Sequence, residues 1–152
     1  MPRYSATTFS TYGLITSIRA TRWLPSAFAQ RIPAVHEKRI EIRWRDMDAF
    51  RHVNHAVFVT YLEEVRDEVM AAALSGVGDV DDFVMVHLEV DYRRPLTQGD
   101  DIVVARCGVH RVGRSSVHTR EEVRTVAGDL AATAVSVMVP VERGPLGVGQ
   151  AA

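Results

Sequence analysis

The sequence predicts an α+β domain in which one long helix packs against a five-stranded antiparallel sheet. Only one segment carries apolar residues at helical spacing, whereas five segments alternate apolar and polar residues or are rich in Val. The last four of these segments are joined by short turns, and short links join antiparallel neighbours. A single helix can cover one face of a curled antiparallel sheet, and 152 residues are enough to bury such a core.

The first strand and the helix are indicated by the spacing of their apolar residues. Residues 38–44 alternate, with Ile40, Ile42 and Trp44 on one face, as in a half-buried strand. Asn54 is a favourable N-cap, and apolar side chains recur at helical spacing from there to residue 70. Gly76 can end the helix as its C′ residue. We therefore expect a strand, a loop and one long helix, in this order.

Four further strands follow the helix. Residues 84–92 alternate and end before Pro95, and residues 102–109, 116–126 and 131–141 are separated by turns at 111–114 and 127–129. The only cysteine, Cys107, lies in the apolar run 102–109, where we expect a buried side chain. A single cysteine excludes an internal disulfide and fits a reducing, cytoplasmic compartment.

The charges divide the chain into an extension, a domain and a tail. Residues 1–36 contain no Asp or Glu and four Arg, which gives +4, whereas the remainder has 14 basic and 19 acidic residues, which gives −5. We expect residues 1–36 to be a disordered extension, residues 37–142 to be the folded domain and residues 143–152 to be a flexible tail. A targeting peptide and translation from a misassigned start are the other interpretations of the extension.

The composition excludes several classes of partner. With 47% hydrophobic and 24% charged residues, the chain has the composition of an ordinary soluble protein. An acidic body gives no reason to expect nucleic-acid binding, and no apolar stretch is long enough to span a membrane. His52 and His55, with two Asp residues close by, lack a third strong ligand, so we expect neither a metal site nor a cofactor.

The loop between the first strand and the helix carries the candidate catalytic residues. It contains Asp46, Asp48, His52 and His55, and Asn54 caps the helix that follows. A carboxylate can act as a general base or as a nucleophile on an ester-like carbonyl. Free N–H groups at a helix N-terminus can stabilise the oxyanion that then develops. We expect Asp46 to be structural and the loop as a whole to be a site for hydrolysing an activated ester.

Residues 45–66 resemble the signature of the hotdog-fold acyl-CoA thioesterases of the 4-hydroxybenzoyl-CoA thioesterase type, in which a D-x-D-x-x-x-H-V-N-N-like loop opens the central helix. Residues 91–101 resemble the strand-ending Y-x-x-P-x-x-x-G-D turn of the same family. The resemblance covers residues 38–141. It implies a hotdog fold, in which the curled sheet wraps the helix. It also implies a homodimer or homotetramer that binds acyl-CoA at a subunit interface without a cofactor.

By this resemblance Asp48 takes the position of the family's catalytic acid, either as a general base or as the nucleophile. His52 matches a His of similar plant-type acyl carrier protein thioesterases, and it is either an acid/base partner or a packing residue at the helix end. Phe50 departs from that pattern, because those relatives have Asn there. Asn54 and His55 stand at the helix N-terminus, where the backbone N–H of His55 corresponds to the family's oxyanion donor.

Further positions are expected to contact the substrate. Glu63 or Glu64 on the helix is expected to face the substrate tunnel or a partner subunit, while Arg66 and Asp67 are expected on a solvated face. Arg114 lies in the turn before the fourth strand, near the nucleotide in relatives, and is expected to bind the phosphates of coenzyme A.

The residues and the resemblance together predict an acyl-CoA thioesterase that hydrolyses an acyl-CoA thioester to a free acid and coenzyme A. Two alternatives stay open. Phe50 leaves room for a non-catalytic module that binds acyl-CoA. A hotdog hydratase or dehydratase ranks lower, because it would need a polar residue at position 50 and a better acid/base pair.

Overall fold

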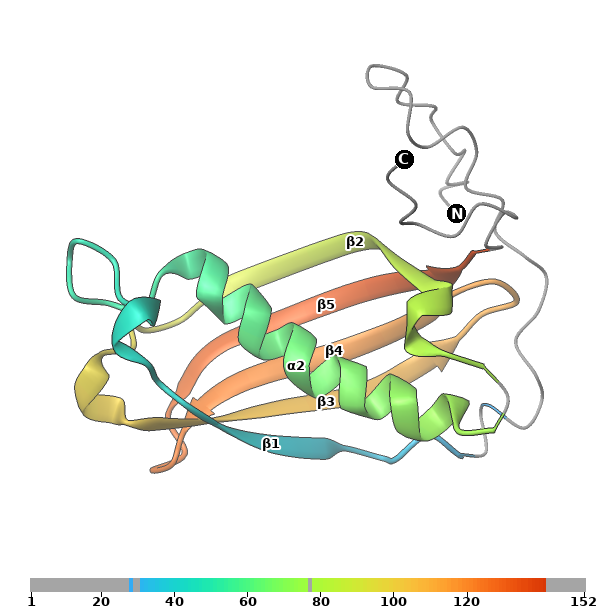
Figure 1. Ribbon diagram of the computed structural model, residues 1–152, viewed down its shortest axis with the longest axis horizontal. Coiled ribbons are helices and arrows are strands. Elements are labelled where there is room, and N and C mark those ends of the chain that lie inside the picture. Colours follow the sequence, from blue (N-terminus) through green and yellow to red (C-terminus); the bar gives the residue numbers. More distant parts are fainter. Residues whose placement is uncertain (1–27, 29–30, 77, 142–152) are drawn as a thin grey trace, which may run out of the picture.

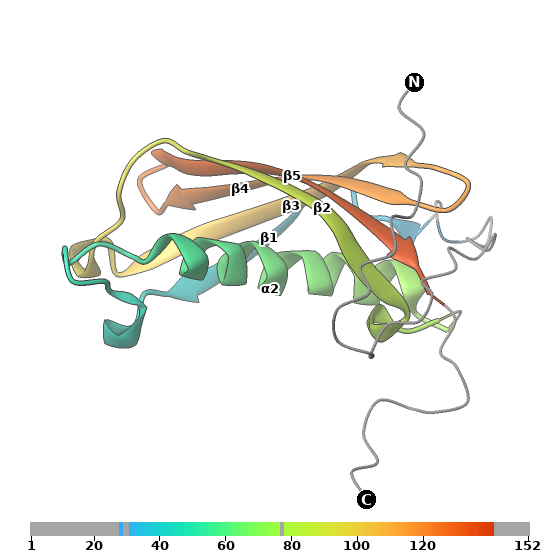
Figure 2. The same ribbon diagram turned by 90° about the horizontal axis from the view of Figure 1, so that it is seen from above.

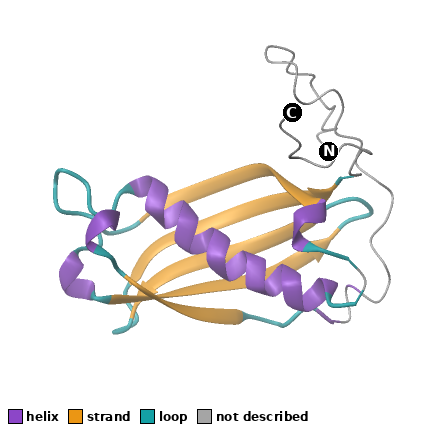
Figure 3. Ribbon diagram, viewed as in Figure 1, coloured by secondary structure: helices purple, strands orange, loops and turns teal. Residues whose placement is uncertain are grey.

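The structure is a computed structural model that describes residue 28, residues 31–76 and residues 78–141. A long helix, α2 (His55–Leu74), lies across a sheet of five strands (Figure 1). In chain order the strands are β1 (His36–Glu41), β2 (Phe83–Tyr92), β3 (Ile102–Val112), β4 (Val117–Thr125) and β5 (Leu130–Pro140). The short 3-10 helices η1 (Trp44–Asp46), η2 (Val80–Asp82) and η3 (Gln98–Asp100) lie in connections, as Figure 3 shows. The expected α+β class and element order are confirmed.

The strands are hydrogen-bonded in the order β1-β3-β4-β5-β2, and every neighbouring pair is antiparallel. β4 is therefore the central strand, and β1 and β2 form the edges. In Figure 2 the sheet curves over α2, and no helix of the described ranges covers the opposite face. Strand residues consequently alternate between a buried face toward the helix and a more open face away from it.

The core lies between α2 and the inner face of the sheet. The buried positions of the helix are Phe58, Tyr61, Leu62, Val65, Arg66, Val69, Met70, Ala73 and Leu74. They recur every three to four residues, as one helical face requires. From β3, Cys107 is buried as expected, and burial, with a smaller contribution from the charge of Glu121, raises the pKa of its thiol to about 12.

The helix begins and ends as the sequence predicts. The side chain of Asn54 accepts a hydrogen bond of 2.9 Å from the backbone N–H of Ala56, which confirms the N-cap. After the C-cap residue Ser75, Gly76 adopts a φ of +76°, a left-handed conformation that favours glycine. No helix in the described part of the chain is both long and apolar enough to cross a membrane.

The expectation for Trp44 is wrong. β1 ends at Glu41, and Trp44 opens the 3-10 turn η1 with 86% of its side chain exposed. The alternation stops because the chain turns after Ile42, whose N–H donates to the carbonyl of Asp101. In this turn the N–H of Asp46 donates to the carbonyl of Arg43. A tight turn changes the direction of each side chain, so the period of two ends with the strand.

The expectation for Arg66 is also wrong. Its side chain is 3% exposed and lies beneath the helix, where Nη1 donates to both carboxylate oxygens of Glu121 at 3.1 and 2.9 Å. Thr119 and Ser136 donate their hydroxyl groups to the same carboxylate. An ion pair with further hydrogen bonds satisfies a buried arginine that isolated helix patterning would place in water.

Some residues before residue 37 contact the rest of the fold. β1 already starts at His36, Phe28 is fully buried, and Arg31 donates to the carbonyl of Ser75 at the helix end. Phe28 stacks on Phe83, with ring centroids 6.3 Å apart. Phe28 packs with Met70, Ala73 and Leu74 and so covers the apolar end of α2. The remainder of the expected extension, residues 1–27 and 29–30, and the expected tail lie outside the described residues.

Candidate active site

The loop before α2 is anchored by Asp46. Its carboxylate oxygen Oδ2 accepts hydrogen bonds from Tyr61 Oη at 2.7 Å and from the backbone N–H of Arg43 at 2.9 Å. Arg43 Nε lies 3.2 Å from the same oxygen, and the carbonyl of Asp46 accepts from Asn54 N–H. Asp46 thus joins the end of β1, the loop and the second turn of the helix. This is the structural role that we expected for it.

The charge state of Asp46 follows from these bonds. Desolvation by burial is the largest influence and opposes ionisation, but the hydrogen bonds from Tyr61 and Arg43 outweigh it and hold the pKa of Asp46 below its usual range. Burial, followed by the bond to Asp46, raises the pKa of Tyr61. The pair therefore consists of a carboxylate and a neutral phenol. The sequence could not reveal this pair, because Tyr61 fits the apolar face of the helix equally well.

Asp48 stands at the turn of the loop and is half-buried. One carboxylate oxygen, Oδ1, accepts from the backbone N–H groups of Phe50 at 2.8 Å and His52 at 3.1 Å. Within the described ranges, Oδ2 has no hydrogen-bond donor. One oxygen therefore fixes the turn and the other is available for chemistry.

The turn after Asp48 is tight. Arg51 has a φ of +62° and donates its N–H to the carbonyl of Asp48, and the N–H of Asp48 reaches the carbonyl of His52. A non-glycine residue in the left-handed region costs on the order of 1 kcal/mol, which the surrounding bonds must offset. Phe50 is 80% exposed at the tip of this turn, so its side chain does not occupy the position of a catalytic amide beside Asp48.

The first turn of α2 supplies one free backbone donor. The cap residue Asn54 accepts hydrogen bonds from two N–H groups of the first turn: its side-chain oxygen accepts from Ala56 and its backbone carbonyl from Val57. Among the described residues, the N–H of His55 has no acceptor. This N–H lies at the positive end of the helix dipole, where an oxyanion is stabilised. The carbonyl of His55 accepts from Tyr92 Oη at 3.0 Å, which ties the helix start to the end of β2.

The side chains of His52 and His55 are both exposed. In the described part of the chain neither ring has a hydrogen bond, an ion pair or a ring contact. The described residues also contain no group of three or more His, Cys, Asp or Glu side chains that could hold a metal ion. The histidines are therefore free to move toward a ligand, whereas Asp48 is held in place.

The remaining expected residues are not brought to this loop within one chain. Glu63 is exposed on α2, about two turns and roughly 12 Å from the helix start. Its neighbour Glu64 forms an ion pair with Lys38 at 3.3 Å. Arg114 is exposed in the turn between β3 and β4, which lies at the far end of the sheet from the helix N-terminus (Figure 1). One chain alone thus keeps Asp48 and Arg114 apart.

Comparisons with known proteins found one family model and several solved structures that this chain resembles. The family model of the Thioesterase-like superfamily matches residues 42–145. The crystal structure of a thioesterase from Thermus thermophilus, complexed with coenzyme A and zinc, is 34% identical, with a TM-score of 0.61 over 70% of this chain and 79% of that chain. A possible acyl-CoA thioesterase from Xanthomonas campestris is 32% identical, with a TM-score of 0.58 over 68% of this chain and 90% of that chain.

A third structure shows the fold alone. The DHNA-CoA thioesterase from Staphylococcus aureus is 18% identical, with a TM-score of 0.60 over 69% of this chain and 72% of that chain. The comparison with curated proteins gave no match. The curled antiparallel sheet around one long helix is thus the hotdog arrangement of solved thioesterases.

Proposed function

The chain belongs to the Thioesterase-like superfamily, and from that premise we propose that it hydrolyses an acyl-CoA thioester to a free acid and coenzyme A. Within the superfamily we assign it to the 4-hydroxybenzoyl-CoA thioesterase type, on the D-x-D loop at residues 46–48. The observation that carries the proposal is a carboxylate with one free oxygen, Asp48, beside a helix start whose first N–H, that of His55, is also free among the described residues. Similar thioesterases support the substrate class.

The proposed reaction divides the work between these two groups. Asp48 either takes a proton from water as the water attacks the thioester carbonyl carbon, or attacks that carbon itself and forms an anhydride that water then opens. The carbonyl oxygen becomes an oxyanion that accepts a hydrogen bond from the backbone N–H of His55. The C–S bond breaks, the thiolate leaves as coenzyme A, and a proton from His52 or from solvent neutralises it. No cofactor takes part.

We also propose that the site is completed by a second copy of the chain. β2 is an edge strand whose outer backbone groups are unpaired within the described part of the chain, and Met85 and Val86 on it are exposed. An antiparallel pairing of two β2 strands about a two-fold axis would join the sheets side by side. It would also bring the turn that carries Arg114 toward the Asp48 loop of the other copy. Glu63 would then face the substrate channel between subunits.

One observation favours a second function. Because Asp48 Oδ1 accepts two backbone N–H groups, an Asp at this place is explained by the turn alone. A non-catalytic module that binds acyl-CoA is therefore the alternative. The two functions differ in turnover and not in affinity.

Hydrolysis of a series of acyl-CoA esters, followed by release of free thiol, tests the proposal. Asp48→Asn should keep the fold and the affinity for coenzyme A but lower kcat by on the order of 10²–10⁴. Asp129→Asn, a surface Asp in the turn between β4 and β5, is the matched control. Near-normal turnover by Asp48→Asn would refute the mechanism, and tight binding without hydrolysis of any ester would establish the binding module.

The same assay tests Arg114. An arginine that meets only the phosphates of coenzyme A binds substrate and transition state equally, so Arg114→Ala should raise KM several-fold and leave kcat almost unchanged. The effect should disappear with a short thioester that lacks the nucleotide. Equal losses with both substrates would instead indicate that Arg114 has a structural role.

A further inference from the structure

Tyr92, the last residue of β2, contacts the start of α2 with its ring and with its hydroxyl group. β2 ends at the same end of the molecule at which α2 begins, as Figure 1 shows. The hydroxyl group donates to the carbonyl of His55 at 3.0 Å, and the ring meets that of Phe58 edge-on, with centroids 5.4 Å apart. Tyr92 is nevertheless 47% exposed, so these two contacts, and not enclosure in the core, hold its side chain.

The chain that follows Tyr92 also holds the loop before the helix. The carbonyl of Leu96, a fully buried residue, accepts the N–H of Val53 at 2.8 Å. Val53 in turn forms a β-bridge with Met47, so the turn that carries Asp48 is closed at its base. Residues 92–96 therefore secure both the base of the Asp48 turn and the first residue of the helix.

A second tyrosine, Tyr61, holds the residue before His55. Tyr61 is fully buried, and its hydroxyl group donates to the carboxylate of Asp46. The carbonyl of Asp46 accepts the N–H of Asn54 at 2.8 Å. Asn54 is thus held through Asp46, and His55 is held directly by Tyr92.

These bonds fix the direction of one backbone N–H group. The N–H of His55 belongs to the planar peptide unit that begins with the carbonyl of Asn54, so it cannot turn without moving that carbonyl. The carbonyl of Asn54 accepts the N–H of Val57 at 2.9 Å. On the other side of the same residue, the carbonyl of His55 is the group that Tyr92 holds. The N–H that has no acceptor among the described residues therefore lies between two anchored carbonyls.

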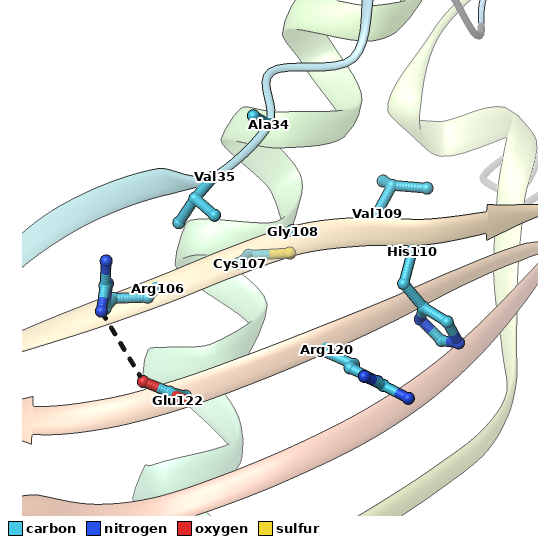
Figure 4. A pocket seen from close by; sticks show the side chains of 9 residues that line it. All are labelled: Ala34, Val35, Arg106, Cys107, Gly108, Val109, His110, Arg120 and Glu122. Atoms are coloured by element: carbon cyan, nitrogen blue, oxygen red, sulfur yellow. Dashed lines mark ion pairs between the residues drawn. The ribbon is translucent and has the colours of Figure 1, made fainter.

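A hollow elsewhere on the molecule takes no part in this arrangement. It has a volume of about 270 Å³ and lies over Gly108 on the face of the sheet that α2 leaves open, and Figure 4 shows the side chains that line it. None of these residues belongs to 43–61 or to 92–96. The positions of Asp48 and His55 therefore depend on hydrogen bonds and ring contacts and not on the walls of that hollow.

We propose that Tyr92 is a positioning residue, whose hydroxyl group keeps the N–H of His55 directed at the oxyanion. This inference rests on the proposed function, and in it Tyr92 acts through His55 and takes no part in the bond changes. The oxyanion develops in the transition state and not in the bound ester, so a misdirected donor weakens the transition state alone. Loss of the hydroxyl group should therefore act on kcat and not on KM.

Tyr92→Phe tests this role, because it keeps the ring that packs on Phe58 and removes only the hydroxyl group. Hexanoyl-CoA and benzoyl-CoA serve as probes, one aliphatic and one aromatic. We expect kcat to fall about tenfold and KM to change less than about twofold, since complete removal of an oxyanion donor costs about 10²–10³. The shape of the pH–rate profile should stay the same, because a positioning hydroxyl group exchanges no proton with the substrate.

The matched control is Asp79→Ala, which also removes one side-chain bond to a backbone group. Asp79 caps η2, where its carboxylate accepts the N–H of Asp81 at 3.3 Å. It follows the other end of α2, about 30 Å from His55 along the helix. This variant should keep the kcat and KM of the wild type, and melting curves check that both variants fold.

Amide hydrogen exchange of the full chain, followed by NMR, tests the same role without turnover. If Tyr92 holds the first turn of α2, the N–H groups of Ala56 and Val57 should exchange about three- to tenfold faster in Tyr92→Phe, since one neutral hydrogen bond to this turn is lost. Asp79→Ala should leave the exchange of both groups unchanged.

Three results would overturn the inference. The first is unchanged exchange at Ala56 and Val57 in Tyr92→Phe. The second is an unchanged kcat in this variant when the wild type is active. The third is a raised KM at constant kcat, or a pH–rate profile of a different shape, because these would indicate substrate binding or proton transfer by Tyr92. A wild type that hydrolyses no acyl-CoA ester would refute the proposed function alone, since faster exchange in Tyr92→Phe would still establish that Tyr92 orders the helix start.

Discussion

Replacing Arg66 by Met removes one half of the buried ion pair under α2. The Met side chain can fill much of the space of the arginine stem, but it leaves the Glu121 carboxylate, whose side chain is 0% exposed, without a cation. Two neutral donors would remain, the hydroxyl groups of Thr119 and Ser136. We expect a loss of about 3–5 kcal/mol in the free energy of unfolding, since a single broken buried pair has this typical cost. The melting temperature should fall by roughly 6–20 °C, at about 2–4 °C per kcal/mol.

A second substitution separates charge from packing. If the cost comes from the unpaired carboxylate, Arg66→Met combined with Glu121→Leu should recover most of the lost stability, because no buried charge remains. Glu121→Leu alone should destabilise as well, since it leaves Arg66 unpaired. Urea unfolding of all four proteins, at one protein concentration, gives the coupling energy.

Two results would refute this reasoning. A loss of less than about 1 kcal/mol for Arg66→Met would mean that the pair behaves as an exposed one. A double variant as unstable as Arg66→Met would mean that the shape of the arginine stem, and not the orphaned charge, carries the effect.

Two further predictions concern Phe28, near the C-terminal end of α2, and Asp46, in the loop before α2. Phe28→Ala should lower the free energy of unfolding by about 3 kcal/mol, because Phe28 is fully buried against Phe83. Val35→Ala, at an exposed site, is the control in urea unfolding. Equally small losses of stability in both variants would contradict the packing of Phe28. Asp46 has a folded pKa below the unfolded value of about 4, so its stabilisation is present above that value and is lost as the pH falls through the folded pKa. Asp46→Asn should therefore be less stable than the wild type at neutral pH, and its melting temperature should change less with pH below about pH 5. A melting temperature that falls with pH as steeply as that of the wild type would contradict this.

The elements were predictable because periodicity is a local signal. Asn54 and Gly76 mark the helix ends through backbone geometry that depends on a few neighbours. Asp48 could be located in the same way, since it lies in a short loop before a capped helix. Trp44 was misplaced because alternation continues in the sequence for three residues after the strand has ended.

The errors arise where residues far apart in the chain meet. Arg66 and Glu121 are 55 positions apart, and either charge alone is typical of a solvated surface. Tyr61 fits an apolar helix face, and only the fold reveals that its hydroxyl group meets Asp46. Phe28 is isolated from any periodic segment, so its burial depends on the end of α2 and on β2. Local patterns cannot report such contacts.

The central strand β4 presents opposite chemistry on its two faces, with Thr119 and Glu121 inward and Arg120 and Glu122 outward. A slip of β4 by one residue would exchange the faces, burying Arg120 without a partner and exposing Glu121. The misaligned sheet would then lose the pair with Arg66 and gain an unmatched charge in the core, which costs several kcal/mol. The Arg66–Glu121 pair therefore forms only when β4 is in its observed register, and it favours that register over a sheet shifted by one residue.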